Sequence, residues 1–81
     1  MQTGSPRRER AAEAVGALTV RQHQVLDHMI RGYLNKQIAA FLGIDEKTVK
    51  MHRAALLRRL GVRSSAEAIR IGVEAGLTDP D

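Results

Sequence analysis

The sequence contains no cysteine and no tryptophan, and it has only one phenylalanine and one tyrosine among its 81 residues. The absence of cysteine excludes disulfides, thiol nucleophiles and thiolate metal sites. Because aromatic residues are scarce, the core must be built from Leu, Ile, Val and Met. No apolar run approaches the roughly 20 residues of a membrane-spanning helix, and no stretch near the N-terminus looks like a secretory signal. We therefore expect a small soluble intracellular protein that does not contact a membrane.

The stretch NKQIAAFLGIDEKTVKMHRAALLRRL, residues 35–60, predicts two helices joined by a turn. Asn35 can cap a short first helix, and Gly43 stands where a left-handed residue would end it. Asp45 can cap a longer second helix over residues 46–59, in which apolar side chains recur at helical spacing. This pair predicts a helix-turn-helix, whose second helix would lie in a DNA major groove.

Two further helices flank this pair. Thr19 and Gln22 have the spacing of a capping box, which would begin a helix that ends near residue 31. Ser64 and Glu67 repeat the pattern at the start of a last helix. With 81 residues there is room for one domain only, so the sequence predicts an all-α, four-helix fold.

Residues 1–17 predict a flexible tail or an interdomain linker. The segment from Arg7 to Val15 could be transiently helical, but Val15 is its only sizeable apolar side chain, so we do not expect firm packing. The arginines of this segment could touch phosphates, although a solubilising tail is the favoured alternative. Residues 78–81 predict a short C-terminal tail.

We do not expect the histidines to form a catalytic or metal site. His23 and His28 are five residues apart, about 140° around a helix, so one metal ion cannot bridge them. His23 and Asp27 are four residues apart and could pair, but a surface hydrogen bond is the commoner meaning of this spacing. Because no nucleophile or third group accompanies them, we predict no enzyme activity, no metal and no cofactor.

Basic charge is concentrated on the predicted helix-turn-helix. The chain has a net charge of +4, but residues 31–63 contain eight Lys and Arg against two acidic residues, a net charge of +6. A solvated basic face is the simple explanation of such a pattern. Its coincidence with a helix-turn-helix favours a polyanion partner, and double-stranded DNA in particular.

The last predicted helix, about residues 65–75, has two apolar sides. Ala68 and Ile71 lie on one side, which can cover the core, while Ile69 and Val73 lie on another. Nothing else in this chain is left to bury the second side, so we expect a partner surface. For a basic helix-turn-helix the natural partner is a second copy. The alternative is that Ile69 and Val73 also pack into the small core.

Several motifs occur in a fixed order and spacing within residues 18–77: LTVR (18–21), NKQIA (35–39), LGI (42–44), EKTVKMHR (46–53), LGVRS (60–64) and EA (67–68). In these motifs the sequence resembles the DNA-binding domain of the LuxR/FixJ, or GerE-type, bacterial transcription regulators, and especially the FixJ-like response regulators. We therefore predict that residues 18–77 form one domain of this kind.

The resemblance implies a helix-turn-helix without a wing. In it, the third predicted helix, about residues 46–59, reads the major groove, and the fourth, about residues 65–75, forms a symmetric homodimer. It also implies a cytoplasmic bacterial transcription regulator and the output domain of a two-component system, with no small-molecule ligand in this chain. The base contacts that it implies are Lys50, Met51 and Ala54. The phosphate contacts would be Asn35, Lys36, Lys47, Thr48, Arg53 and Arg58. The dimer interface would contain Ala66, Ile69, Arg70 and Val73.

Two positions depart from the family pattern. Gln22 replaces the usual Glu, and Ala54 replaces a basic residue that some members use to read bases, which leaves most of the direct readout to Lys50. The sequence leaves open whether the chain is an excised output domain or a stand-alone regulator. The alternative function is a protein-interaction module with incidental DNA affinity.

Overall fold

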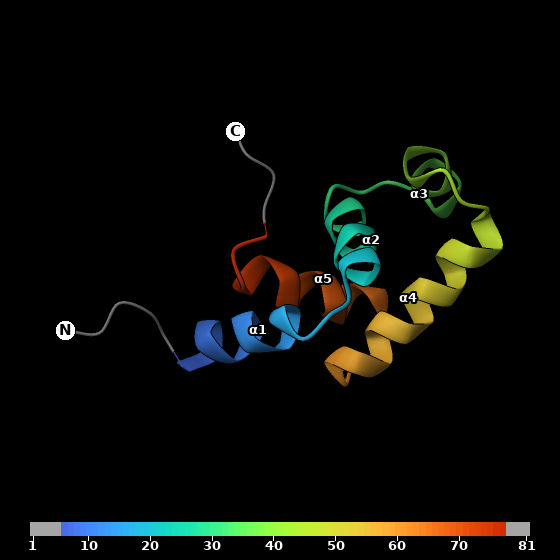
Figure 1. The fold of residues 1–81 in the computed structure, drawn as a ribbon. Helices are drawn as coiled ribbons and strands as arrows, with labels where there is room; N and C mark the ends of the chain where they lie inside the picture. The colour runs from blue at the N-terminus through green and yellow to red at the C-terminus, as the bar shows by residue number, and fades with distance from the viewer. Residues whose placement is uncertain (1–5, 78–81) are drawn as a thin grey trace.

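A computed structural model describes residues 6–77 of the protein, and these residues fold into five α-helices without any strand. Helices α1 and α5 lie side by side at one end, α3 lies at the other, and α4 runs diagonally along the outer edge (Figure 1). The predicted all-α fold is confirmed. The tail predicted at residues 78–81 lies outside the described residues. The helices are α1 Pro6–Gly16, α2 Val20–Ile30, α3 Asn35–Leu42, α4 Glu46–Leu60 and α5 Ser65–Glu74.

The capping box predicted at the start of α2 is present. The Gln22 backbone N–H donates to the Thr19 hydroxyl over 3.1 Å, and the Thr19 backbone N–H donates to the Gln22 side-chain oxygen over 3.0 Å. At the start of α5, the Glu67 N–H donates to the Ser64 hydroxyl, which itself donates to the Glu67 carboxylate. These local hydrogen bonds fix where both helices begin.

The cap predicted for α3 was wrong by one residue. Leu34, not Asn35, is the N-cap residue, and its backbone N–H donates to the Gln37 side-chain oxygen over 2.8 Å. The Gln37 oxygen accepts this bond and satisfies the Leu34 N–H, while the leucine side chain itself makes no capping hydrogen bond. Asn35 becomes the first helical residue, and its side-chain oxygen is free to accept a hydrogen bond from a distant element.

The turn between α3 and α4 contains the two helix-capping residues that the sequence predicts. Gly43 ends α3 in the left-handed conformation, with φ of 67°. Asp45 then caps α4, and its carboxylate accepts a hydrogen bond from the Thr48 backbone N–H over 2.6 Å. Hydrogen bonds from the Thr48 hydroxyl and backbone lower the pKa of Asp45 below its ordinary value of 3.8. The ionised carboxylate therefore stabilises the start of α4.

This cap predicts a specific pH dependence of stability. Because the folded-state pKa of Asp45 is lowered, its contribution is complete above about pH 4 and is lost as the pH falls through the folded-state value. Asp45→Asn keeps an uncharged cap acceptor and lacks that titration. Thermal unfolding measured between about pH 2.5 and pH 6 should therefore show a shallower decline of Tm in the variant. Identical declines would remove Asp45 from the acid sensitivity of the fold.

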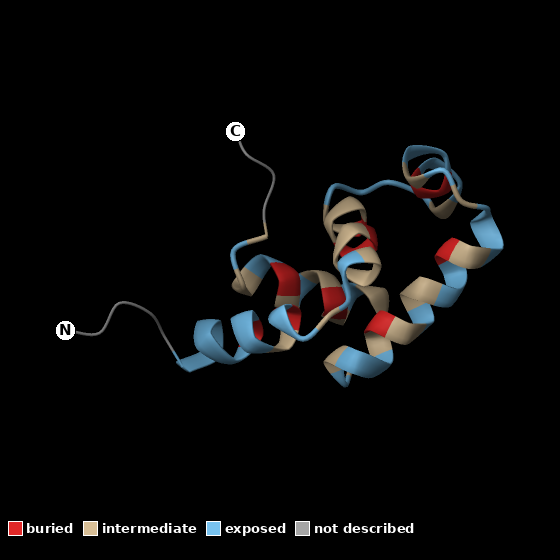
Figure 2. Ribbon diagram, in the orientation of Figure 1, coloured by how far each residue is buried: buried red, intermediate tan, exposed pale blue. Residues whose placement is uncertain are grey.

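The core lies where α2, α4 and α5 meet, with α3 packed against α4. The buried positions of each helix face inward, while the outer edge of α4 is largely exposed (Figure 2). Gly72 lets α5 approach α2 closely, since a Cβ atom there would lie 2.6 Å from the Ile30 Cδ1 atom. The largest fully buried side chains are all aliphatic, as predicted: Leu26, Ile38, Leu56, Val25 and Val49.

The expectation that the segment from Arg7 to Val15 does not pack firmly was wrong. Helix α1 packs on α5 and buries Ala11 and Val15 to 5% and 6% exposure, and Arg7 pairs with Glu74 at 3.7 Å. The sequence argument counted large apolar residues only. Here a small alanine one turn before Val15 allows close approach to α5, which tertiary packing can exploit despite low intrinsic hydrophobicity.

Across residues 6–77, none of the helices combines the length and the apolar character that crossing a bilayer would require.

Candidate nucleic-acid interface

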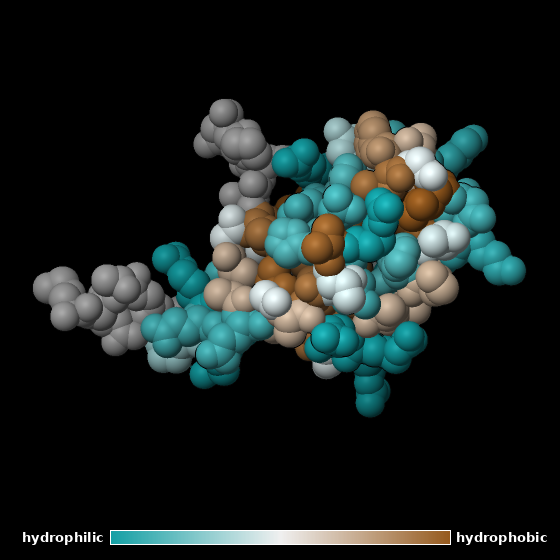
Figure 3. Space-filling view, in the orientation of Figure 1, coloured by the Kyte–Doolittle hydropathy of each residue, from teal (hydrophilic) through white to brown (hydrophobic). Residues whose placement is uncertain are grey.

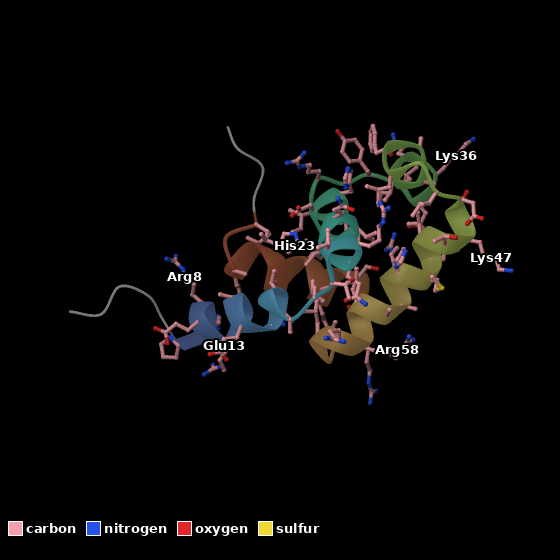
Figure 4. The ribbon with its side chains drawn as sticks, in the orientation of Figure 1. Arg8, Glu13, His23, Lys36, Lys47 and Arg58 are labelled. Atoms are coloured by element: carbon pink, nitrogen blue, oxygen red, sulfur yellow. The ribbon has the colours of Figure 1, made fainter. Side chains whose placement is uncertain are left out.

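One face of α4 is exposed along its whole length. Its members are spaced by three or four residues, so they share one side of the helix. Because a helix rises 1.5 Å per residue, this face is about 16 Å long, enough to follow a major groove about 12 Å wide. Lys36, Lys47 and Arg58 extend outward along the edge that α3 and α4 form (Figure 4). The exposed residues of this face are Lys47, Lys50, Met51, Ala54 and Arg58.

The three predicted base contacts therefore lie together on this face. Met51 is 58% exposed, which is unusual for a large apolar side chain, and Ala54 beside it leaves room for close approach. Lys50 is 64% exposed and pairs with Glu46 at 3.8 Å, one turn earlier. Such an exposed pair is weak and can be exchanged for another partner at little cost.

The predicted phosphate contacts do not all lie in equivalent environments. Lys36 is exposed at the N-terminal end of α3, whose first-turn N–H groups have no partner within the helix. Lys47 is likewise exposed, in the first turn of α4. Thr48 is half-buried and hydrogen bonded to Asp45, so it is less available than its sequence position suggests.

Arg53 lies in a different environment from the other predicted contacts. It is half-buried, and its guanidinium donates one hydrogen bond to the Asn35 side-chain oxygen and another to the Ser65 hydroxyl. These three residues come from α4, α3 and α5. The sequence analysis missed this connection, because its partners are 18 and 12 residues away and no local pattern links them.

On α5, the structure separates the residues predicted for the dimer interface. Ala66, Arg70 and Val73 are exposed on one side of the helix, and Val73 is 45% exposed. Ile69 is half-buried and packs against the core, as the alternative interpretation had it. The apolar second side of α5 is thus narrower than predicted, although Val73 remains on it.

His23 and His28 each lie beside a polar group of their own helix, α2. His23 lies 3.3 Å from Asp27 between the ring Nδ1 and a carboxylate oxygen, the predicted surface pair. The His28 Nδ1 atom lies 2.7 Å from the Gln24 carbonyl oxygen. Within the described part of the chain, no three side chains of His, Asp or Glu gather as a metal site would require.

An exposed ring cluster was not predicted from the sequence. His28 stacks on Phe41, with ring centroids 5.4 Å apart, and Phe41 meets the edge of Tyr33 at 4.8 Å. Phe41 is 55% exposed and Tyr33 is 36% exposed. Apolar side chains gather over α3 at the upper right of the molecule, next to the hydrophilic edge (Figure 3). The rings come from α2, the following turn and α3, so only the tertiary fold brings them together.

The chain is similar to a known protein family and to several known proteins. Residues 16–72 match the family described as bacterial regulatory proteins, luxR family. The chain is 41% identical over 69 residues to the response regulator protein TodT of Pseudomonas putida, which covers 85% of this chain and 30% of TodT.

Two solved structures have a similar fold. The response regulator StyR matches with a TM-score of 0.74 and 42% identity, over 82% of this chain and 33% of that one. Full-length FixJ from B. japonicum matches with a TM-score of 0.78 and 29% identity, over 90% of this chain and 37% of that one. The chain therefore spans about a third of the length of these proteins.

Proposed function

The chain belongs to the luxR family of bacterial regulatory proteins, a family of DNA-binding transcription regulators, and from this premise we propose that it recognises a specific double-stranded DNA sequence through α4. The observation that carries the proposal is the exposed face of α4. It combines cations with small and flexible side chains over three helical turns, and no acidic residue interrupts it between Lys47 and Arg58. A groove-reading helix requires this combination of charge and close approach.

In the proposed complex, Lys50 reaches base edges in the major groove, with Met51 and Ala54 against neighbouring bases. Lysine donates to guanine acceptors, and small or apolar side chains can contact thymine methyl groups. Lys47 and Arg58, near the two ends of the same face, would reach the phosphates on either side of the groove.

Helix α3 would supply a second phosphate anchor. Its N-terminus carries the partial positive charge of the helix dipole and the unsatisfied first-turn N–H groups, a combination that binds anions. Lys36 is exposed at this end and adds a full charge. Contacts of this kind fix the register of α4 on the duplex without reading its sequence.

We further propose that two copies bind together through α5. Its exposed side carries Val73 and Ala66, which two copies could cover reciprocally around a two-fold axis. The operator would then contain two symmetric half-sites. Since TodT and StyR are both response regulators, we propose that this domain is the output unit of such a cytoplasmic regulator.

A second candidate is a protein-interaction module with incidental DNA affinity. The exposed rings of Phe41 and Tyr33 favour it, because exposed aromatic groups are enriched where proteins meet. Selection of bound sequences from a random pool of duplex DNA, with the purified 81-residue chain at moderate salt, separates the two. An enriched two-fold symmetric site would establish the regulator, its dimer and its operator. Salt-sensitive retention without an enriched sequence would favour the interaction module.

Replacing Lys36 provides a separate prediction about the phosphate anchor. Lys36→Ala should weaken binding to all DNA sequences alike and lower the slope of log affinity against log salt by about one unit, because one fewer counterion is released. The matched control is Arg10→Ala, which removes an exposed cation from α1, at the other end of the molecule. An unchanged salt slope in Lys36→Ala would exclude this lysine from the interface.

A further inference from the structure

Arg53 connects the three helices on which the proposed DNA complex depends. It projects from the middle of α4 and donates to Asn35, the first residue of α3, and to Ser65, the first residue of α5. Each acceptor therefore lies at the beginning of a helix, so the bonds from Arg53 fix the positions of these two helix ends relative to α4. The shallow groove around Arg53 is lined by apolar atoms of Met29, Leu34 and Ile69, among others.

The chemistry of the side chain suits this connection. A guanidinium is planar and always charged, and its donors form a rigid fork, so two acceptors in different directions are held in a fixed relation. Its Nη1 donates to Asn35 and its Nη2 to Ser65. Hydrogen bonds from a charged donor are about twice as strong as neutral ones, and partial burial reduces competition from water.

We propose that Arg53 is a positioning residue that sets the angle between the DNA-reading helix α4 and the dimerising helix α5, while it also fixes the N-terminus of α3. This inference rests on the proposed function. It assigns to Arg53 a role other than the phosphate contact implied by its sequence position. Arg53 would act on DNA through the helices that it holds, not through a bond to the duplex.

The consequence is a strict spacing between half-sites. In a symmetric dimer, the two α4 helices enter successive major grooves at a separation that the angle between α4 and α5 determines. One added base pair moves a half-site by 3.4 Å and rotates it by about 34°. If Arg53 keeps that angle fixed, the dimer cannot follow the change. If the connection is lost, α5 can move relative to α4 and other spacings become acceptable.

The test compares Arg53→Met with the unmodified chain on DNA with one half-site and with paired half-sites at different spacings. For Arg53→Met we expect affinity for the best-spaced site to fall about tenfold, because α4 and α5 are no longer held in advance at the angle that this site requires. One extra base pair between the half-sites should cost Arg53→Met about threefold less affinity than it costs the unmodified chain, since the variant can still engage both half-sites. The dependence of affinity on salt should stay unchanged, as Arg53 releases no counterion.

Three further observations make the test decisive. Arg53→Lys keeps the charge but cannot donate to both acceptors from one rigid fork, so it should restore affinity only in part. Ser65→Ala removes the connection to α5 alone, and it should broaden the accepted spacings with little change on a single half-site. Ser65→Ala carries the test if Arg53→Met does not fold, which thermal unfolding will show.

A salt slope lowered by about one unit in Arg53→Met would identify a phosphate contact and overturn the proposal. Unchanged spacing preference in Ser65→Ala, or in a folded Arg53→Met, would also overturn it. These results differ from failure of the proposed function. In that case the unmodified chain would show no preferred sequence at all, whereas here it would still select a symmetric site.

Discussion

Val73→Asp should reduce the complex on a symmetric site from two copies to one. Val73 is 45% exposed on the side of α5 that we propose as the dimer surface. Burial of an unpaired carboxylate costs several kcal/mol, and the two-fold axis introduces the substitution twice. Affinity for the paired site should therefore fall about 100-fold, to that of a single half-site, since the gain from simultaneous binding is lost.

The substitution should leave the monomer folded. The side chain at position 73 is exposed in the free chain, and it lines a shallow groove with the paired Arg7 and Glu74, so the new carboxylate meets water. Surface substitutions of this kind usually change stability very little. Thermal unfolding of the variant should show a Tm close to that of the unmodified chain.

Gel mobility or analytical ultracentrifugation of the DNA complex would measure the number of bound copies. The matched control is Val20→Asp, which makes the same change at a valine that is 77% exposed outside α5. It should bind as two copies with nearly unchanged affinity. If Val73→Asp still binds as two copies, the dimer surface lies elsewhere on the molecule.

Features that depend on neighbouring residues could be predicted from the sequence. The bonds between Thr19 and Gln22, and the cap from Asp45, join residues three apart, and Gly43 is a local conformational choice. Such signals need no knowledge of the tertiary fold. The exposed face of α4 was predictable for the same reason, because helical periodicity alone places its members on one side.

Apart from the start of α3, where the bond between Leu34 and Gln37 is local, the features that were missed depend on residues brought together by folding. The sequence could not show that Ala11 and Val15 become buried where α1 packs on α5. It also suggested that Asn35 caps its own helix, whereas that oxygen accepts a bond from Arg53, 18 residues away. The site is therefore predictable in the residues that it exposes to solvent, but not in the contacts that hold its helices at fixed angles.

Lys50→Ala should cost about 1 to 3 kcal/mol on the preferred site, which is roughly a 5- to 150-fold loss of affinity, and much less on scrambled DNA. The reason is the composition of the exposed face of α4. Since position 54 is an alanine, Lys50 is the main hydrogen-bond donor among the three proposed base contacts. The lysine must leave Glu46 to reach a base, but that pair is exposed and costs little to break.

Binding of Lys50→Ala to the selected site and to a scrambled site of equal length measures this effect, with Lys47→Ala as the matched control. Lys47 is exposed on the same face, and as a phosphate contact it should weaken binding to both DNAs alike and flatten the salt dependence. Equal losses on both DNAs for Lys50→Ala would make it a phosphate contact as well. Specificity would then have to come from Met51, from Ala54 and from the sequence-dependent shape of the duplex.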